Sequence, residues 1–326
     1  MLQAVVVGAG GWAYTGLPVP TPAPHEVLVR VHAVGLNRAD LDERDGRYRG
    51  KAHDPALPNV AGAELAGAVE WVGGEVTGVV PGDRVMAMVN GAFAEYAVVD
   101  ARLLLPVPAA LTWTAAAALP VACLTEHDAL VARAGLRPGD SVLVLGATSG
   151  VGVFAAALAR ELGAATVLGT SRSAAKLKLV PGLDVAIDTS TTDLADAVLE
   201  STGGAGADVV VDHVGGELTD RAIAATRVGG TVVQVGRLAG DRALLDLGRL
   251  AYRRVRLVGT TFRTRTSAEH AEVVAGVRAD VLPLVGSGRL GVPVDRVFAF
   301  TDLDAAYAYV TSGSSVGKVV LTLGDE

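Results

Sequence analysis

The sequence has very little cysteine, and Cys123 is its one example in 326 residues. A single thiol excludes disulfides within the chain and excludes the cysteine clusters that hold structural zinc. It also fits a reducing compartment. The N-terminal residues lack the basic start and apolar run of a signal peptide, so we expect a cytoplasmic protein.

Positive charge is scarce as well. The formal net charge is -7, and no dense stretch of Lys and Arg exists, so nucleic acid is not expected as a partner. The uncharged run 103–125 contains Pro106, Pro108 and Pro120, which argues against a membrane helix. With 50% hydrophobic residues, a chain of this length is expected to form two globular domains.

Two patterns of apolar residues divide the chain. Between residues 26 and 105 the apolar stretches are short, roughly alternating and separated by Gly and Pro, which predicts a mostly β domain. Strands are expected at 26–32, 64–72, 83–88, 93–99 and 102–105. From Ser141 onward, strand and helix patterns alternate, which predicts a doubly wound parallel sheet covered on both faces.

The tail has helical stretches at 267–285 and 303–310, and it ends in a strand-like segment at 318–323. We expect it to rejoin the first domain because the parallel sheet is already complete. The prediction is therefore an α/β protein in which 1–119 and 266–326 form one domain and 120–265 form a Rossmann domain.

The segment 142–152 is a buried strand that runs into a turn of small residues and then into an apolar helix. Such a turn lets the backbone approach a dinucleotide pyrophosphate, and the helix N-terminus offers unpaired N–H groups. The expected contacts are Ser149, Gly150, Val151 and Gly152. A similar pattern at 5–13 is rejected, because the four prolines that follow it prevent a helix.

The end of the second Rossmann strand indicates which nicotinamide cofactor is bound. An acidic residue there holds the ribose 2′-hydroxyl of NADH. This chain has no carboxylate at 169–173 and instead presents Ser171 and Arg172, followed by Lys176. These side chains favour the 2′-phosphate of NADPH. A solvated helix face is the alternative explanation for the lysines, above all for Lys178.

Several short motifs occur in a specific order. They are Val34-Gly35-Leu36-Asn37-Arg38-Ala39-Asp40, Gly62-Ala63-Glu64-Leu65-Ala66-Gly67, Pro81-Gly82-Asp83-Arg84-Val85, Leu136-Arg137-Pro138-Gly139-Asp140, Gly150-Val151-Gly152 and Gly317-Lys318-Val319-Val320-Leu321. On these motifs the chain resembles the medium-chain dehydrogenase/reductase superfamily, and within it the zinc-free quinone oxidoreductase (zeta-crystallin-like) branch. The resemblance spans nearly the whole sequence.

The resemblance implies a GroES-like catalytic domain built from both chain ends, a Rossmann domain between them and commonly a homodimer joined through the last Rossmann strands. It also bears on zinc. Asn37 stands where the alcohol dehydrogenase branch has its first ligand cysteine, and Ala63 replaces the ligand histidine. No metal ligand is therefore expected.

The resemblance also implies site residues. Asn37 and Tyr48 correspond to an asparagine and a tyrosine near the nicotinamide, and Tyr48 is the candidate for positioning the acceptor or supplying its proton. Ordinary roles as a turn residue and a half-buried loop aromatic remain open. The other expected cofactor contacts are Thr125, Val214, Gly236, Arg237, Phe262, Arg263 and Lys318. Lys318 is expected at the 2′-phosphate, although Ser315 replaces the asparagine usual three residues earlier.

Without zinc, the fitting chemistry is hydride transfer to an acceptor that is already electron-poor, such as a quinone or an enone. Two alternatives stay open: an enoyl-thioester reductase of fatty-acid or polyketide type, and a non-catalytic NADPH-binding protein. His213 follows a strand end, where it suggests either acid-base work or a residue lining the cofactor cleft. Glu126 and His127 lack a second histidine at ligand spacing, so no metal is expected there.

Overall fold

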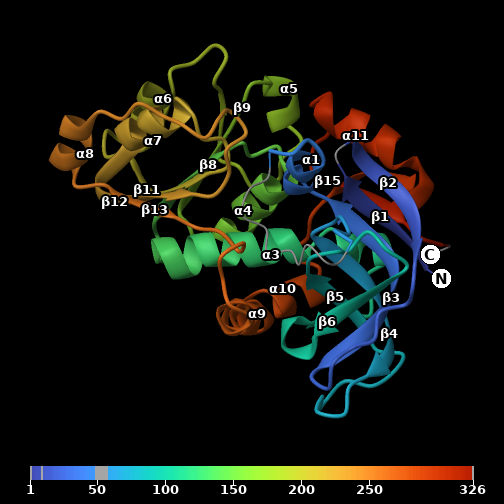
Figure 1. Ribbon diagram of the computed structural model, residues 1–326. Helices are drawn as coiled ribbons and strands as arrows, with labels where there is room; N and C mark the ends of the chain where they lie inside the picture. Colours follow the sequence, from blue (N-terminus) through green and yellow to red (C-terminus); the bar gives the residue numbers. More distant parts are fainter. Residues whose placement is uncertain (1, 9, 48–57, 325–326) are drawn as a thin grey trace. The chain divides into compact units, whose positions relative to one another are not determined.

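The computed structural model describes residues 2–8, 10–47 and 58–324. The chain divides into two compact units: unit 1 comprises Met1–Leu124 and Phe262–Glu326, and unit 2 comprises Thr125–Thr261. The boundaries expected from the sequence were 119/120 and 265/266, so the division lies a few residues from both. The blue N-terminal and red C-terminal parts of the ribbon belong to the same unit (Figure 1).

Unit 1 is built on a seven-stranded sheet in the order β14-β15-β3-β4-β5-β7, with β6 also paired to β3. Its strands are β3 (Glu26–Leu36), β4 (Glu64–Val72), β5 (Arg84–Met88), β6 (Tyr96–Asp100), β7 (Leu105–Pro106), β14 (Val294–Ala299) and β15 (Lys318–Thr322). The C-terminal strand β15 pairs with β3 in antiparallel register, with Leu321 opposite Val34. The tail thus adds its last strand to the sheet of unit 1.

A separate hairpin of β1 (Leu2–Gly8) and β2 (Gly11–Leu17) opens the chain. Among the described residues of the glycine pattern at 5–13, β1 is followed by β2 and not by a helix. The prediction of a strand at 102–105 is wrong for residues 102 and 103. Asp100 accepts a hydrogen bond from the Arg102 N–H at 3.0 Å, and this local turn forms the 3-10 helix η1 (Ala101–Leu103).

The helices of unit 1 are α1 (Arg38–Arg44), α2 (Trp113–Ala117), α9 (Ser267–Asp280), α10 (Leu282–Gly286) and α11 (Leu303–Thr311), together with the short 3-10 turn η3 (Phe300–Asp302). α3 (Pro120–His127) crosses the boundary between the units and continues into the π-helical turn η2 (Asp128–Ala134). The helical run Trp113–Ala134 is long and apolar enough to span a membrane, but its most apolar stretch is 72% buried inside the protein. Burial of this kind is expected of a core helix.

Unit 2 contains a six-stranded sheet in the order β10-β9-β8-β11-β12-β13, and its neighbouring strands run parallel. The strands are β8 (Ser141–Leu145), β9 (Thr166–Ser171), β10 (Val185–Asp188), β11 (Ala207–Asp212), β12 (Thr226–Gln234) and β13 (Arg256–Gly259). The helices between them are α4 (Gly150–Glu161), α5 (Ala174–Leu177), α6 (Leu194–Ser201), α7 (Leu218–Ala225) and α8 (Leu247–Arg253). The predicted doubly wound domain is confirmed, and β8, β11 and β12 run side by side in Figure 1.

The order of the strands places a switch point beside β8. From β8 the chain moves first to β9 and β10 on one side and then to β11, β12 and β13 on the other. Ligands of open parallel sheets bind outside the carboxyl ends of the strands at such a point. The turn between β8 and α4 is therefore the expected position of a ligand.

Candidate functional site

The turn between β8 and α4 is held by hydrogen bonds to the neighbouring strand β9. The N–H of Gly146 donates to Thr170 Oγ1 at 3.1 Å, and the N–H of Ala147 donates to the Thr170 carbonyl at 2.9 Å. Gly146 has a φ of +76°, which favours glycine because a side chain is strained there. The turn is thus fixed by β9 on one side and by the start of α4 on the other.

Ser149 caps the N-terminus of α4. Its hydroxyl accepts a hydrogen bond from the Gly152 N–H at 3.1 Å and donates to the Gly146 carbonyl at 2.9 Å. A Cβ on Gly152 would lie 2.3 Å from that same carbonyl oxygen, so the helix packs against the turn only with glycine at this position. Gly150 and Val151 begin α4, where a helix leaves its first N–H groups without partners inside the helix. The arrangement suits an anion.

Two cationic side chains follow the adjacent strand β9. Arg172 is exposed immediately after the strand end at Ser171, and Ser173 caps the short helix that carries Lys176. The hydroxyl oxygens of Ser171 and Thr148 are 3.5 Å apart, which connects this strand end to the turn after β8. The residues predicted to hold a 2′-phosphate thus lie next to the predicted pyrophosphate turn.

The ends of β11 and β12 complete the same edge of unit 2. Asp212 closes the turn after β11, because its Oδ1 accepts the N–H groups of Val214 and Gly215 at 2.8 Å each. After β12, Gly236 packs so closely that a Cβ there would lie 2.2 Å from the His213 carbonyl oxygen. The exposed Arg237 follows and pairs with Asp241 at 3.4 Å.

Unit 1 brings together another set of predicted residues. The Asn37 amide Nδ2 donates to Glu64 Oε1 at 2.8 Å and to the Gly35 carbonyl at 3.3 Å, while its Oδ1 accepts from Lys318 Nζ at 2.6 Å. Glu64 Oε2 accepts the N–H of Val121, at the start of α3, at 2.8 Å. We call Asn37, Asp40, Glu64 and Lys318 the buried network. The sequence alone does not indicate that Glu64 belongs to this network.

Lys318 has a different environment from the one its predicted role requires. Its side chain is buried, and its ammonium group pairs with the Glu64 carboxylate. A cation that is buried and already neutralised within unit 1 does not present its charge to a cofactor phosphate. We therefore no longer propose Lys318 as a 2′-phosphate ligand and assign it to the buried network.

Asp40 is the second carboxyl group of the buried network. Its Oδ2 accepts the N–H of Asn37 at 2.8 Å at the start of α1. Burial raises the pKa of Asp40 to about 7, the Glu64 charge adds to this rise, and the Asn37 N–H and the Lys318 charge oppose it. Asp40 therefore exchanges its proton near neutral pH in the folded protein.

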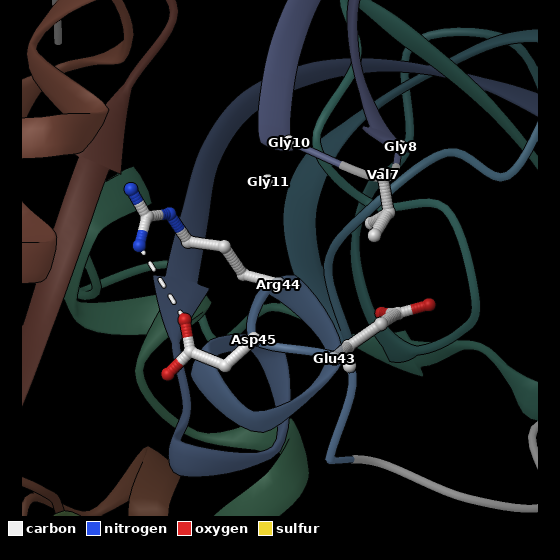
Figure 2. Close-up of a pocket in the computed structure, with 8 residues that line it drawn as sticks. Val7, Gly8, Gly10, Gly11, Glu43, Arg44 and Asp45 are labelled. Atoms are coloured by element: carbon white, nitrogen blue, oxygen red, sulfur yellow. Dashed lines mark hydrogen bonds and ion pairs between the residues drawn. The ribbon is translucent and has the colours of Figure 1, made fainter.

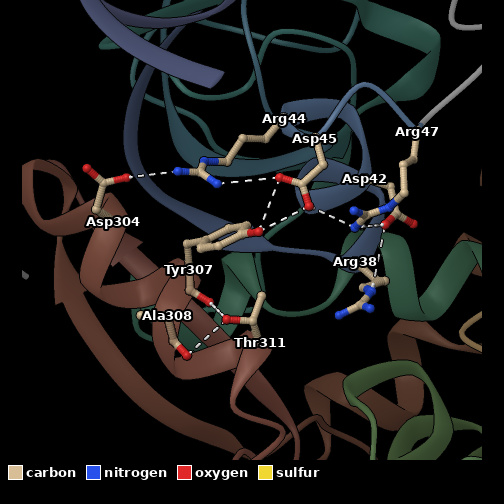
Figure 3. Close-up of polar contacts among 9 residues, drawn as sticks. All are labelled: Arg38, Asp42, Arg44, Asp45, Arg47, Asp304, Tyr307, Ala308 and Thr311. Atoms are coloured by element: carbon tan, nitrogen blue, oxygen red, sulfur yellow. Dashed lines mark hydrogen bonds and ion pairs between the residues drawn. The ribbon is translucent and has the colours of Figure 1, made fainter. Parts of the chain in front are cut away.

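The end of α1 borders a pocket of about 540 Å³ that is also lined by the β1–β2 hairpin. In Figure 2, Arg44 reaches toward Asp45, while Glu43 points the other way. Figure 3 extends the contacts to α11, where the Tyr307 hydroxyl donates to both Asp45 oxygens at 3.0 and 3.1 Å. The Arg44 guanidinium lies 3.9 Å from the centre of the Tyr307 ring. These contacts fix the chain just before residue 48.

The remaining predicted residues are distributed between the two units. Tyr48 lies outside the described residues. Phe262 and Arg263 are half-buried at the start of the second segment of unit 1, where Phe262 contacts His270 with ring centres 5.1 Å apart. Thr125 is half-buried on α3 at the start of unit 2, directly before the buried Glu126.

Two family models match the chain. The model described as alcohol dehydrogenase GroES-like domain matches residues 23–109, and the one described as zinc-binding dehydrogenase matches residues 150–277. Rat quinone oxidoreductase is 31% identical over 317 residues, which cover 94% of this chain and 91% of the rat protein. The chain belongs to the medium-chain dehydrogenase/reductase superfamily.

Other relatives in this superfamily are more similar in sequence but much longer. The chain is 37% identical over 307 residues to the polyketide synthase protein NorB of Streptomyces orinoci, which covers 92% of this chain. It spans only 13% of the length of NorB. Among solved structures, the mycobacterial protein Rv1454c in complex with NADPH has a TM-score of 0.86 and 32% identity, with 99% of this chain and 100% of that chain covered.

Zinc is implied by the description of one family model, so the donor set of this superfamily member must be examined. Among the residues that the structure describes, no group of three or more His, Cys, Asp or Glu side chains is arranged to hold a metal ion. Cys123 is buried, and burial raises the pKa of its thiol well above the ordinary range. Within residues 2–8, 10–47 and 58–324, the available donor groups do not fit zinc.

Proposed function

We propose that the protein is an NADPH-dependent reductase that passes hydride to a quinone or an α,β-unsaturated carbonyl compound without zinc. The observation that carries the proposal is the edge of unit 2 where the turn 146–152 meets the end of β9. A small-residue turn, a capped helix start and two cationic side chains lie there together. This combination suits a dinucleotide that carries an extra phosphate.

The cofactor has a defined set of proposed contacts in unit 2. Ser149, Gly150, Val151 and Gly152 receive the pyrophosphate, and Ser171, Arg172 and Lys176 receive the 2′-phosphate. Val214, Gly236 and Arg237 line the same edge beyond β8. Thr125 on α3, together with Phe262 and Arg263 of unit 1, remains a proposed contact of the nicotinamide half. The NADPH found in the similar mycobacterial structure supports this choice of cofactor.

The acceptor is proposed from chemistry and from the named relatives. Bound NADPH would supply a hydride, and the acceptor must then carry a developing negative charge on oxygen. A conjugated acceptor spreads that charge, so hydrogen bonds and a proton suffice. Tyr48 is the proposed donor of that proton or hydrogen bond. The side-chain amide of Asn37 is hydrogen-bonded to Glu64 and Lys318. We therefore propose Asn37 as a positioning residue that holds the start of α1.

The cofactor preference is tested by replacing both cations after β9. In the double variant Arg172→Ala and Lys176→Ala, the dissociation constant for NADPH measured by calorimetry should rise by about tenfold or more, because charge-assisted bonds to the phosphate are lost. The affinity for NADH should hardly change. Lys178→Ala is the matched control, since Lys178 is an exposed lysine two residues beyond Lys176. Tighter binding of NADH than of NADPH by the wild-type protein would contradict the proposal.

An enoyl-thioester reductase is the second candidate, favoured by one observation. The identity to NorB, 37%, exceeds the 31% identity to rat quinone oxidoreductase. Steady-state oxidation of NADPH with quinones, enones and crotonyl thioesters separates the two candidates by kcat/KM. A preference for thioesters would replace the leading choice. Tight NADPH binding without reduction of any acceptor would favour a non-catalytic role.

A homodimer is proposed through the exposed end of the unit 2 sheet. β13 is an edge strand, and the segment that precedes it in the chain carries Leu244, Leu247 and Tyr252, which are exposed by 92, 69 and 84%. Large apolar side chains this exposed suit burial against another copy. Sedimentation equilibrium should give a dimer, and Tyr252→Glu should shift it toward monomer. A wild-type monomer at micromolar concentration would exclude this assembly.

A further inference from the structure

His213 is a buried imidazole at the carboxyl edge of the unit 2 sheet. It follows the last residue of β11 and is 3% exposed. Its Nδ1 lies 3.0 Å from the carbonyl oxygen of Leu145, the last residue of β8, and its Nε2 lies 2.8 Å from Oε1 of Glu126 on α3. One ring therefore connects two strand ends to the helix that carries Thr125.

The partners of the ring determine where its protons lie. A carbonyl oxygen can only accept, so Nδ1 carries a proton and donates it to Leu145. The contact between Nε2 and Glu126 Oε1 then needs one further proton. Burial opposes a charged ring most strongly, but the Glu126 charge and hydrogen bond, the Leu145 carbonyl and the Asp212 charge together raise the pKa of His213. An imidazolium that faces a carboxylate satisfies all of these contacts.

His213 also lies close to the two glycine turns of the candidate cofactor site. A Cβ on Gly236 would lie 2.2 Å from the His213 carbonyl oxygen, so the turn after β12 rests directly on it. A Cβ on Gly146 would lie 3.7 Å from the His213 Cβ. A displacement of His213 would therefore shift both turns, because close-packed interiors transmit strain.

Glu126 depends on His213 in turn. Its side chain is fully buried, and its Oε2 has no hydrogen-bond partner within the part of the chain that the structure describes. The carboxylate is therefore held on this side of α3 through Oε1 and the ring. Loss of either partner leaves a buried polar group unpaired, which is costly.

We propose that the bond between His213 and Glu126 positions the Gly146 turn and α3 for binding of the dinucleotide. The proposal rests on the proposed function, because it assigns the cofactor to this edge of unit 2. His213 and Glu126 act in it as positioning residues that need not touch the cofactor. They set the geometry of the main-chain groups and of Thr125, which do.

The bond itself is tested by nitrogen-15 NMR of protein labelled at histidine. The chain has six histidines, and the signal that His213→Asn removes identifies the ring. Both ring nitrogens of His213 should give signals of protonated nitrogen at neutral pH. In Glu126→Gln the side-chain amide should donate to Nε2, and the Nε2 signal should move to the position of an unprotonated acceptor. A wild-type Nε2 signal that Glu126→Gln leaves unchanged would show that the bond is absent.

The positioning role is tested by calorimetry with NADPH. Glu126→Ala removes the bond and should weaken binding by about tenfold or more, because small misplacements in a site have effects of this size or larger. Glu126→Gln keeps a hydrogen bond and should stay within about threefold of the wild type. Val198→Ala, in the core of unit 2 on α6, is the control for a general loss of stability and should lower the Tm without changing the affinity.

The outcomes separate the two proposals. If the wild-type protein binds NADPH and Glu126→Ala binds it equally well, the pair is only structural and the inference fails. If Glu126→Ala does not fold, the decision passes to Glu126→Gln and the NMR signal, where loss of the Nε2 proton with unchanged geometry supports the bond. A wild-type protein that binds neither NADPH nor NADH contradicts the proposed function and the positioning role together.

Discussion

The two units use polar groups in opposite ways. At the carboxyl edge of the unit 2 sheet, small residues leave main-chain N–H groups at the start of α4 available to a ligand. In unit 1, the side chains of Asn37, Glu64 and Lys318 form hydrogen bonds with one another in the buried network. A ligand can therefore be bound mainly by backbone N–H groups with few side chains, whereas the stability of the buried network requires every polar member to keep its partner.

The largest effect is expected from breaking the ion pair of the buried network. Lys318→Met leaves the Glu64 carboxylate buried without its cation, which should lower the free energy of unfolding by about 3–5 kcal/mol. Urea unfolding followed by tryptophan fluorescence reports on unit 1, because Trp12, Trp71 and Trp113 all lie there.

The matched control removes the charge on both sides. Adding Glu64→Gln to Lys318→Met should recover a large part of the lost stability, because no uncompensated charge remains in the interior. If the single variant unfolds at the wild-type urea concentration, the ion pair contributes little, and the contrast between the two units loses its basis.

A smaller effect is expected from the proton of Asp40. The raised pKa of about 7 means that the folded protein keeps this proton at pH values where the unfolded chain has lost it. The free energy of unfolding should therefore fall as the pH rises from about 4 to about 7 and then level off. Asp40→Asn should flatten this slope and exceed the wild type in stability at pH 8, by up to about 4 kcal/mol at 1.4 kcal/mol per pKa unit. A slope equal to that of the wild type would contradict the assignment.

The candidate site in unit 2 could be proposed from the sequence because its elements are contiguous in the chain. The strand, the small-residue turn and the helix start are contiguous at 141–152, and the geometry of such a turn is set by residue size. The cations at Arg172 and Lys176 follow the next strand and were found by the same rule. The local geometry of such a contiguous segment follows from its own residues and does not depend on which distant segments pair with it.

The buried network could not be predicted in the same way. Glu64 and Lys318 are 254 residues apart, and only the pairing of β15 with β3, next to β4, brings them together. Likewise, the bond between His213 and Glu126 joins residues 87 positions apart.

A substitution at Gly152 should affect unit 2 alone. In Gly152→Ala the new methyl group would lie 2.3 Å from the Gly146 carbonyl oxygen, so α4 must move away from the turn. Affinity for NADPH should fall by about tenfold or more, while the tryptophan-detected unfolding of unit 1 should not change. Gly286→Ala is the control, because a Cβ there meets nothing within 4 Å. Unchanged NADPH affinity in Gly152→Ala would remove the turn from the site.

The smallest effect on stability is expected at the partly exposed contacts at the end of α1. Tyr307→Phe removes the hydroxyl that bonds Asp45 but keeps the ring beside Arg44, so it should cost about 1 kcal/mol of stability. Because Asp45 precedes the segment that carries Tyr48, the KM for the acceptor should rise more than kcat falls. Tyr309→Phe, which loses an exposed bond to Asp295, is the control and should leave KM unchanged. Equal KM values in the two variants would show that these contacts stabilise unit 1 without shaping the acceptor site.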